Sequence, residues 1–227
     1  MADDRQFDTI LFDLEGTLID FQWRLAAAND EILKTLIRFG IDPDIYGKTP
    51  DYACFYNTTR DITAVWEKKD AVQLFDQLSL LYDKYDQDAL SRWAPYPDTQ
   101  HLLTRLSAAG YRMGIVSNIG AWAANKVLES FNLAMYFEII LSRNDVTYIK
   151  PHSEGIELAL EKLCTSARRT LFVGDSRNDI IAADRAEMPS CFLSKGESKT
   201  TGQNADSATF QVSSLSGIID ILSAQTF

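Results

Sequence analysis

The fold of this chain is decided by residues 8–17, which read DTILFDLEGT. Positions 8–12 form a short apolar run, which is typical of a strand buried on both faces of a parallel sheet. The run ends at Asp13, and Gly16 allows the chain to turn sharply. Because ligands bind beyond the carboxyl ends of strands in open α/β sheets, Asp13 and Glu15 are predicted to lie at a binding site.

Similar apolar runs recur along the chain and alternate with helical patterns. Strands are predicted at residues 8–12, 112–116, 137–141, 170–173, 190–193 and 209–212. Helices are predicted at residues 99–109, 121–131, 153–163, 179–186 and 215–222. This alternation predicts an α/β fold, a three-layer, Rossmann-like parallel sheet with helices on both faces.

One long segment lacks strand patterns. Residues 20–93 are amphipathic and rich in aromatic side chains, and Pro95 and Pro97 mark the return to alternating elements. We therefore expect an all-helical cap domain at 20–93, inserted into a core domain formed by residues 1–19 and 94–227. The polar stretch 194–207 is predicted to be a loop.

Composition narrows the class of protein. The chain has 227 residues, 46% of them hydrophobic and 24% charged, with a formal net charge of -10. That acidity disfavours nucleic acids and anionic membranes as partners, and no apolar run is long enough for a membrane span. Three scattered cysteines without a CxxC pair, and a start that lacks a signal peptide, predict a cytoplasmic protein. We expect a monomer or homodimer.

Polar side chains follow three other predicted strands or their loops. Ser117 and Asn118 end the strand at 112–116, where a hydroxyl and backbone N–H groups suit a phosphate oxygen. Lys150 follows the strand at 137–141, and its ammonium could screen a carboxylate nucleophile from a phosphate dianion. Asp175 and Asp179 follow the strand at 170–173, one helical turn apart, where they could bind a divalent cation.

Each group alone has an ordinary structural explanation, but their order along the chain resembles the haloacid dehalogenase superfamily. Its four motifs are Asp-x-Asp-x-Thr, Ser or Thr, Lys, and Gly-Asp-x-x-x-Asp. They match Asp13 to Thr17, Ser117, Lys150, and Gly174 to Asp179, and the resemblance covers nearly the whole chain. The stretch from Pro95 to Asn118 is similar to the phosphoglycolate-phosphatase-like branch, which carries a helical cap.

The resemblance implies a phosphatase that hydrolyses a small phosphorylated metabolite through an aspartyl-phosphate intermediate. Catalysis would fall to Asp13 as nucleophile, Glu15 as acid and base, and Lys150 as charge neutraliser. Mg²⁺ would be held by Asp13, the Glu15 backbone carbonyl, Asp175 and Asp179. Thr17, Ser117 and Asn118 would bind the phosphoryl group, and Arg60 of the cap is predicted to contact the rest of the substrate.

Two positions depart from the family pattern. Glu15 stands where the family usually has Asp, and one extra methylene moves a general acid by about 1 Å, a distance that affects rate. A site repacked around Glu15, a slow phosphatase and a protein that has given up catalysis all fit this residue. Glu187 stands where relatives usually have glycine, so the preceding helix must end in a left-handed non-glycine residue or in another turn.

Other functions fit parts of the pattern. A 2-haloacid dehalogenase-type hydrolase would also use Asp13 but needs neither Mg²⁺ nor the second acid, and the spacing of Thr17, Asp175 and Asp179 argues against it. A phosphomutase shares the first half of the reaction. A catalytically weakened regulatory homologue would bind phosphate or Mg²⁺ without turnover.

Overall fold

The computed structural model describes residues 5–20, 23–194 and 207–224. Within these residues a six-stranded sheet has the order β5-β4-β1-β6-β7-β8, and every neighbouring pair is parallel. The strands are β1 (Thr9–Phe12), β4 (Arg112–Val116), β5 (Ile139–Leu141), β6 (Thr170–Gly174), β7 (Ser190–Leu193) and β8 (Phe210–Val212). The predicted α/β fold with a parallel sheet is confirmed.

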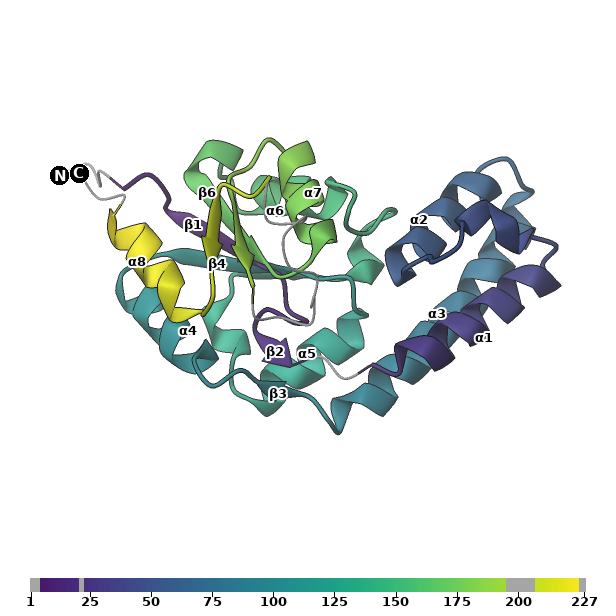
Figure 1. Ribbon diagram of the computed structural model, residues 1–227, viewed down its shortest axis with the longest axis horizontal. Helices are drawn as coiled ribbons and strands as arrows, with labels where there is room; N and C mark the ends of the chain where they lie inside the picture. Colours follow the sequence, from purple (N-terminus) through teal and green to yellow (C-terminus); the bar gives the residue numbers. More distant parts are fainter. Residues whose placement is uncertain (1–4, 21–22, 195–206, 225–227) are drawn as a thin grey trace.

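Helices cover both faces of this sheet (Figure 1). Helices α4 (Thr99–Ala108), α5 (Ala121–Ser130) and α8 (Ser216–Ala224) share one hydrophobic cluster, and α6 (Glu154–Lys162) and α7 (Arg177–Arg185) share another. Strand β1 divides its side chains between the two clusters, with Ile10 and Phe12 in the first and Leu11 in the second. This alternation is the period of a strand buried on both faces.

Three helices extend to one side of the sheet (Figure 1). They are α1 (Leu25–Arg38), α2 (Tyr52–Thr63) and α3 (Lys68–Leu90), which we call the cap helices. Most of their buried side chains belong to one hydrophobic cluster. Among the described residues, Ile149 is the one buried member of this cluster that lies outside residues 20–93. The helical nature of this segment agrees with the sequence, whereas its division from the core as a separate domain remains a prediction.

The chain leaves and re-enters the core through two very short strands that the sequence did not predict. Strand β2 (Ile19–Asp20) pairs antiparallel with β3 (Ala94–Pro95). Two residues carry too little periodicity to be recognised as a strand. The short 3₁₀ helices are η1 (Pro43–Tyr46), η2 (Ala134–Tyr136), η3 (Arg143–Asp145) and η4 (Ala167–Arg169).

The register of the sheet brings strand ends together. Phe12 of β1 is level with Ile115 of β4 on one side and Val173 of β6 on the other. Residues that follow these three strands must therefore meet at one edge of the sheet, as the sequence predicted.

The end of helix α7 is the second position at which the sequence departs from the family pattern. Helix α7 closes with Glu187 in the left-handed region, at φ 51°, and Met188 N donates to Ala183 O at 2.9 Å. The left-handed ending is thus the one that the chain adopts.

The predicted loop at 194–207 lies almost entirely outside the described residues. Across the described ranges, no helix combines the length and the apolar character that a bilayer crossing requires.

Candidate active site

Asp13 and Lys150 form a buried ion pair at the edge of the sheet. Each side chain belongs to a residue that is 4% exposed. Lys150 Nζ donates to Asp13 Oδ1 and to the carbonyl oxygen of Val116 at 2.8 Å, and it lies 2.7 Å from Asp179 Oδ1. The ammonium group therefore sits between two carboxylates and a strand-end carbonyl.

Three carboxylates converge beside this lysine. One oxygen from each of Asp13, Asp175 and Asp179 lies within 4.8 Å of the other two. Asp175 follows β6, and Asp179 lies in the first turn of α7. Asp179 Oδ2 accepts from Ser176 N at 3.0 Å and from Ser176 Oγ at 2.6 Å, so the N-terminal cap of α7 fixes the orientation of this carboxylate.

The local structure suits a divalent cation bound by oxygen atoms. Asp179 Oδ1 is buried without a hydrogen-bond partner among the described atoms, its contact with Lys150 being an ion pair. Gly16 has a φ of 75°, and a Cβ there would lie 2.4 Å from Asp175 Oδ2. Glycine is thus needed both for the turn and for the Asp175 carboxylate to reach the cluster. Three converging carboxylates fit Mg²⁺, which prefers oxygen ligands.

Burial and mutual repulsion raise the pKa values of the acids. Burial, and then the charge of Asp179, raise the pKa of Asp13 to about 7, although Lys150 acts in the opposite direction. Burial, and then the charge of Asp13, hold the pKa of Glu15 well above its usual range. Burial alone would lower the pKa of Lys150, but the charges of Asp13, Asp179 and Glu15 outweigh it and raise that pKa. Glu15 is therefore protonated more readily than an exposed glutamate.

The hydroxyl groups predicted to bind phosphate both contact acidic residues. Thr17 Oγ1 donates to Asp175 Oδ1 at 3.2 Å, and Ser117 Oγ donates to Glu15 Oε2 at 2.8 Å. Thr17 is fully buried, and Ser117 is 4% exposed. Each hydroxyl lies next to a predicted catalytic or metal-binding residue, and their roles toward phosphate stay predictions.

Asn118 and Arg60 have structural partners that the sequence did not indicate. The Asn118 amide donates to the Lys150 carbonyl and accepts from the Lys150 N–H, both at 3.0 Å, so it holds the backbone of that lysine. Arg60 lies 3.5 Å above the ring of Phe75 and lines a cavity other than the one around Asp13. Arg60 is not among the residues that line the cavity around Asp13, and its contact with substrate stays a prediction.

A cavity of about 390 Å³ lies between the acidic cluster and the cap helices. Asp13, Glu15 and Lys150 line this cavity, and so do Trp23, Tyr52, Asp86 and Arg143. The sequence did not single out Tyr52, Asp86 or Arg143. Arg143 follows β5 directly after Ser142, so the rule used for the other strand ends could have found it; Asp86, in mid-helix, carries no such signal.

Comparisons with known proteins identify the family. The sequence pattern of the haloacid dehalogenase-like hydrolases matches residues 10–193. A phosphoglycolate phosphatase of Colwellia psychrerythraea is 30% identical over 192 residues, covering 83% of this chain and 85% of that protein. A phosphoglycolate phosphatase of Neisseria gonorrhoeae is 31% identical over 201 residues, covering 88% and 85%. The chain belongs to the haloacid dehalogenase-like hydrolase family.

Solved structures agree in fold. A predicted phosphoglycolate phosphatase of Haemophilus somnus superposes with a TM-score of 0.63 at 22% identity, covering 95% of this chain and 98% of that one. A haloacid dehalogenase-like hydrolase of Bacteroides fragilis gives 0.65 at 24% identity, covering 93% and 99%. The predicted superfamily, the similarity to its phosphoglycolate-phosphatase-like branch and the class of phosphoric monoester hydrolase are confirmed by these matches taken together.

Proposed function

We propose that this protein is a Mg²⁺-dependent phosphatase that hydrolyses a small phosphate ester through an aspartyl-phosphate at Asp13. The observation that carries the proposal is the convergence of Asp13, Lys150, Asp175 and Asp179 at the edge of one cavity. A buried carboxylate cannot approach a phosphate dianion unless positive charge offsets the repulsion. The ammonium of Lys150, beside Asp13, supplies part of that charge.

The acidic cluster would hold the metal. Asp13, Asp175 and Asp179 supply carboxylate oxygens, and the backbone carbonyl of Glu15 is a further candidate ligand. When bound, Mg²⁺ supplies positive charge that stabilises the equatorial oxygens of a transferring phosphoryl group. The ion would also favour the ionised form of Asp13, whose pKa is raised to about 7 by burial and Asp179 in the structure.

The proposed reaction has two steps. In the first, an Asp13 carboxylate oxygen forms a bond to phosphorus, the bond to the ester oxygen breaks, and the leaving oxygen takes the proton of Glu15. In the second, a water molecule gives a proton to Glu15 and attacks phosphorus, which releases phosphate and restores Asp13. The raised pKa of Glu15, caused by burial and by Asp13, favours the protonated acid that the first step needs.

The relatives suggest where to look for the substrate. Because the curated relatives reported above are phosphoglycolate phosphatases, 2-phosphoglycolate is the first compound to test. In this proposal residues 20–93 form the cap that closes over the ester, Thr17 and Ser117 hold the phosphoryl group, and the protein acts in the cytoplasm as a monomer or homodimer.

A screen of phosphorylated metabolites with Mg²⁺ tests the proposal. We expect release of inorganic phosphate from at least one small ester, and its loss both with a chelator and in Asp13→Asn. Asp184→Asn, on the exposed side of α7, is the matched control and should keep full activity. If none of the esters released phosphate, the proposal would be contradicted. Activity that survives the chelator would favour a metal-independent hydrolase.

A further inference from the structure

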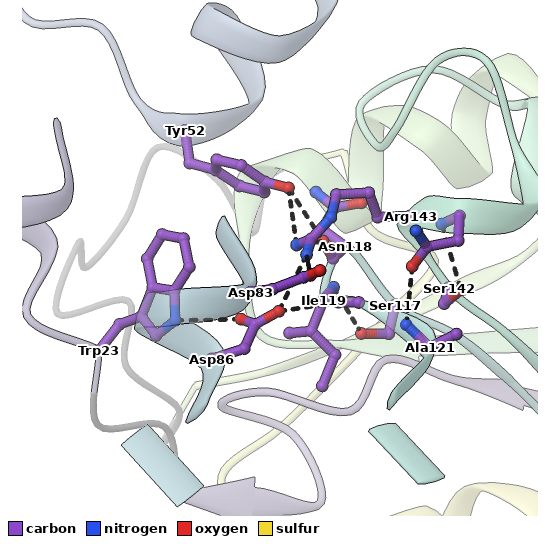
Figure 2. Close-up of polar contacts among 12 residues, drawn as sticks. Trp23, Tyr52, Asp83, Asp86, Ser117, Asn118, Ile119, Ala121, Ser142 and Arg143 are labelled. Atoms are coloured by element: carbon purple, nitrogen blue, oxygen red, sulfur yellow. Dashed lines mark hydrogen bonds and ion pairs between the residues drawn. The ribbon is translucent and has the colours of Figure 1, made fainter. Parts of the chain in front are cut away.

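A buried cluster of polar side chains joins the cap helices to the core beside the candidate active site (Figure 2). Arg143, in η3 after β5, contributes the guanidinium group. Asp86 of α3 accepts from Arg143 Nη2 at 3.0 Å, and the hydroxyl of Tyr52 in α2 accepts from Arg143 Nη1 at 3.2 Å. We call these three residues the clasp. Asp83 binds the same guanidinium at 2.7 Å from its outer side.

The clasp is nearly closed to solvent. Arg143 is 3% exposed and Asp86 is 1% exposed, whereas the Asp83 side chain is 44% exposed. Buried charges are stable only while they remain paired, so neither Arg143 nor Asp86 can leave the other without a large cost. Trp23 adds a second donor to Asp86, with Nε1 at 3.1 Å from Oδ1. The cap helices are thereby fixed to the loop that follows β5.

The same residues hold the backbone of the turn at 117–120, which begins with the serine predicted to bind phosphate. The Tyr52 hydroxyl donates to the carbonyl of Asn118 at 3.2 Å. The N–H of Arg143 donates to the carbonyl of Ile119 at 2.9 Å, and the N–H of Gly120 donates to Asp86 Oδ2 at 3.1 Å. Three successive residues of the turn thus find partners in the clasp.

Gly120 shows how closely the turn approaches these side chains. A Cβ at this position would lie 2.7 Å from Arg143 Nη2 and 3.1 Å from Asp86 Oδ2. Its φ is -69°, so the backbone does not itself require glycine. The absence of a side chain is what allows the turn, the guanidinium and the carboxylate to pack together.

We propose that Arg143 is a positioning residue, which together with Asp86 and Tyr52 makes the geometry of the 117–120 turn depend on the seating of the cap helices. Withdrawal of α2 and α3 would remove Asp86 from Gly120 N and the Tyr52 hydroxyl from Asn118 O, which would keep only a 3.5 Å contact with Arg143 Nη1. The turn then loses the contacts that orient Ser117, whose Oγ also accepts from Ile119 N at 3.1 Å and donates to Glu15. The cap therefore completes the core site as well as covering it.

Amide hydrogen exchange tests this without any substrate. With Mg²⁺ and inorganic phosphate present, Arg143→Met and Asp86→Asn should speed exchange in peptides spanning 117–120 by about ten-fold or more, because locally opened amides lose protection. Peptides from β7 should be unchanged. Asp83→Asn is the control and should leave exchange at 117–120 as in the wild type, since Asp83 contacts the same guanidinium from the solvent side. Tyr52→Phe, which keeps the ring, gives a milder second variant if the buried substitutions fail to fold.

Activity provides the second arm, which rests on the proposed function. Arg143→Met and Asp86→Asn should lower kcat about ten-fold while KM changes less, because a misplaced turn weakens transition-state contacts most. Unchanged exchange at 117–120, or faster exchange with unchanged kcat, would overturn the positioning role. Faster exchange throughout the core would also overturn it, because it would show general destabilisation. An inactive wild type would overturn the proposed function alone, since the exchange arm uses no ester.

Discussion

At the scale of single residues, Glu15 is the departure from the family pattern that bears most on catalysis. Its carboxyl accepts a hydrogen bond from Ser117 Oγ at 2.8 Å, which is a defined position rather than a loose one. This contact favours a site repacked around glutamate over a site that has lost catalysis. The longer side chain reaches the serine hydroxyl at the end of the neighbouring strand.

Shortening this side chain tests that interpretation. Glu15→Asp should lower kcat by about 10²-fold, because an acid displaced by about 1 Å no longer reaches the leaving oxygen. Steady-state kinetics on the best ester from the metabolite screen would measure it. A rise in kcat would instead show that glutamate is a handicap. Glu138→Asp, at an exposed ion pair far from the site, is the matched control.

The buried carboxylate of Asp13 predicts a pH dependence of stability. Its pKa is raised from 3.8 to about 7, first by burial and then by Asp179, so the folded protein binds this proton more tightly than the unfolded chain does. The stabilising effect of the proton is full below about pH 4 and is lost as the pH rises toward 7. The raised pKa of Glu15 acts in the same direction.

Chemical unfolding of the metal-free protein at several pH values would measure this effect. Asp13→Asn should flatten the fall in unfolding free energy between about pH 4 and pH 7, because the amide does not titrate. Asp184→Asn should leave the slope as in the wild type. An identical slope in Asp13→Asn would show that other groups carry the dependence.

At the scale of elements, the N-terminus of α7 links helix stability to the proposed metal site. Ser176 caps the helix and holds Asp179 Oδ2. Ser176→Ala should lower the unfolding free energy by about 1 kcal/mol, the usual cost of a lost N-cap. It should also weaken Mg²⁺ binding, because the Asp179 carboxylate loses its orientation.

Calorimetric titration with Mg²⁺ and chemical unfolding would measure the two effects separately. Asp98→Ala at the start of α4 is the control, since Asp98 is exposed and makes no capping hydrogen bond. Unchanged Mg²⁺ affinity in Ser176→Ala would show that the cap does not orient the metal ligand.

Helix α2 carries a second prediction, because Arg60 packs within the cap helices. Its guanidinium stacks on Phe75 and donates to the Tyr56 hydroxyl at 3.1 Å. Arg60→Ala should lower the unfolding free energy by about 1 kcal/mol through the lost cation–π contact. It should leave KM unchanged, because Arg60 does not line the cavity around Asp13.

Kinetics and unfolding of Arg60→Ala would check both parts, with Arg38→Ala, an exposed arginine of α1, as the control. A large rise in KM would support the sequence-based prediction that Arg60 contacts substrate.

At the scale of the whole molecule, metal binding should stabilise the fold. The cluster of Asp13, Asp175 and Asp179 joins two strand ends and a helix, and an unfolded chain does not bring them together. Mg²⁺ at a hundred times its Kd should raise the unfolding free energy by about 2.7 kcal/mol. Asp175→Asn should abolish most of this increase, whatever it does to the metal-free protein.

Thermal unfolding with and without Mg²⁺ would measure the increase, and Asp184→Asn should retain it. An equal increase in Asp175→Asn would place the metal outside this cluster.

The sequence by itself determined the parallel sheet and the residues at its edge. Apolar runs of four or five residues predict buried strands. Because a parallel sheet brings the carboxyl ends of its strands to one edge, Asp13, Ser117 and Asp175 could be grouped from the sequence alone. Only the tertiary structure decided what the cap helices contribute. The amphipathic pattern of these helices does not say which helix faces the core. Only the packing of the folded chain set Arg60 apart from the cavity and brought Asp86 and Arg143 together across 57 positions of the chain.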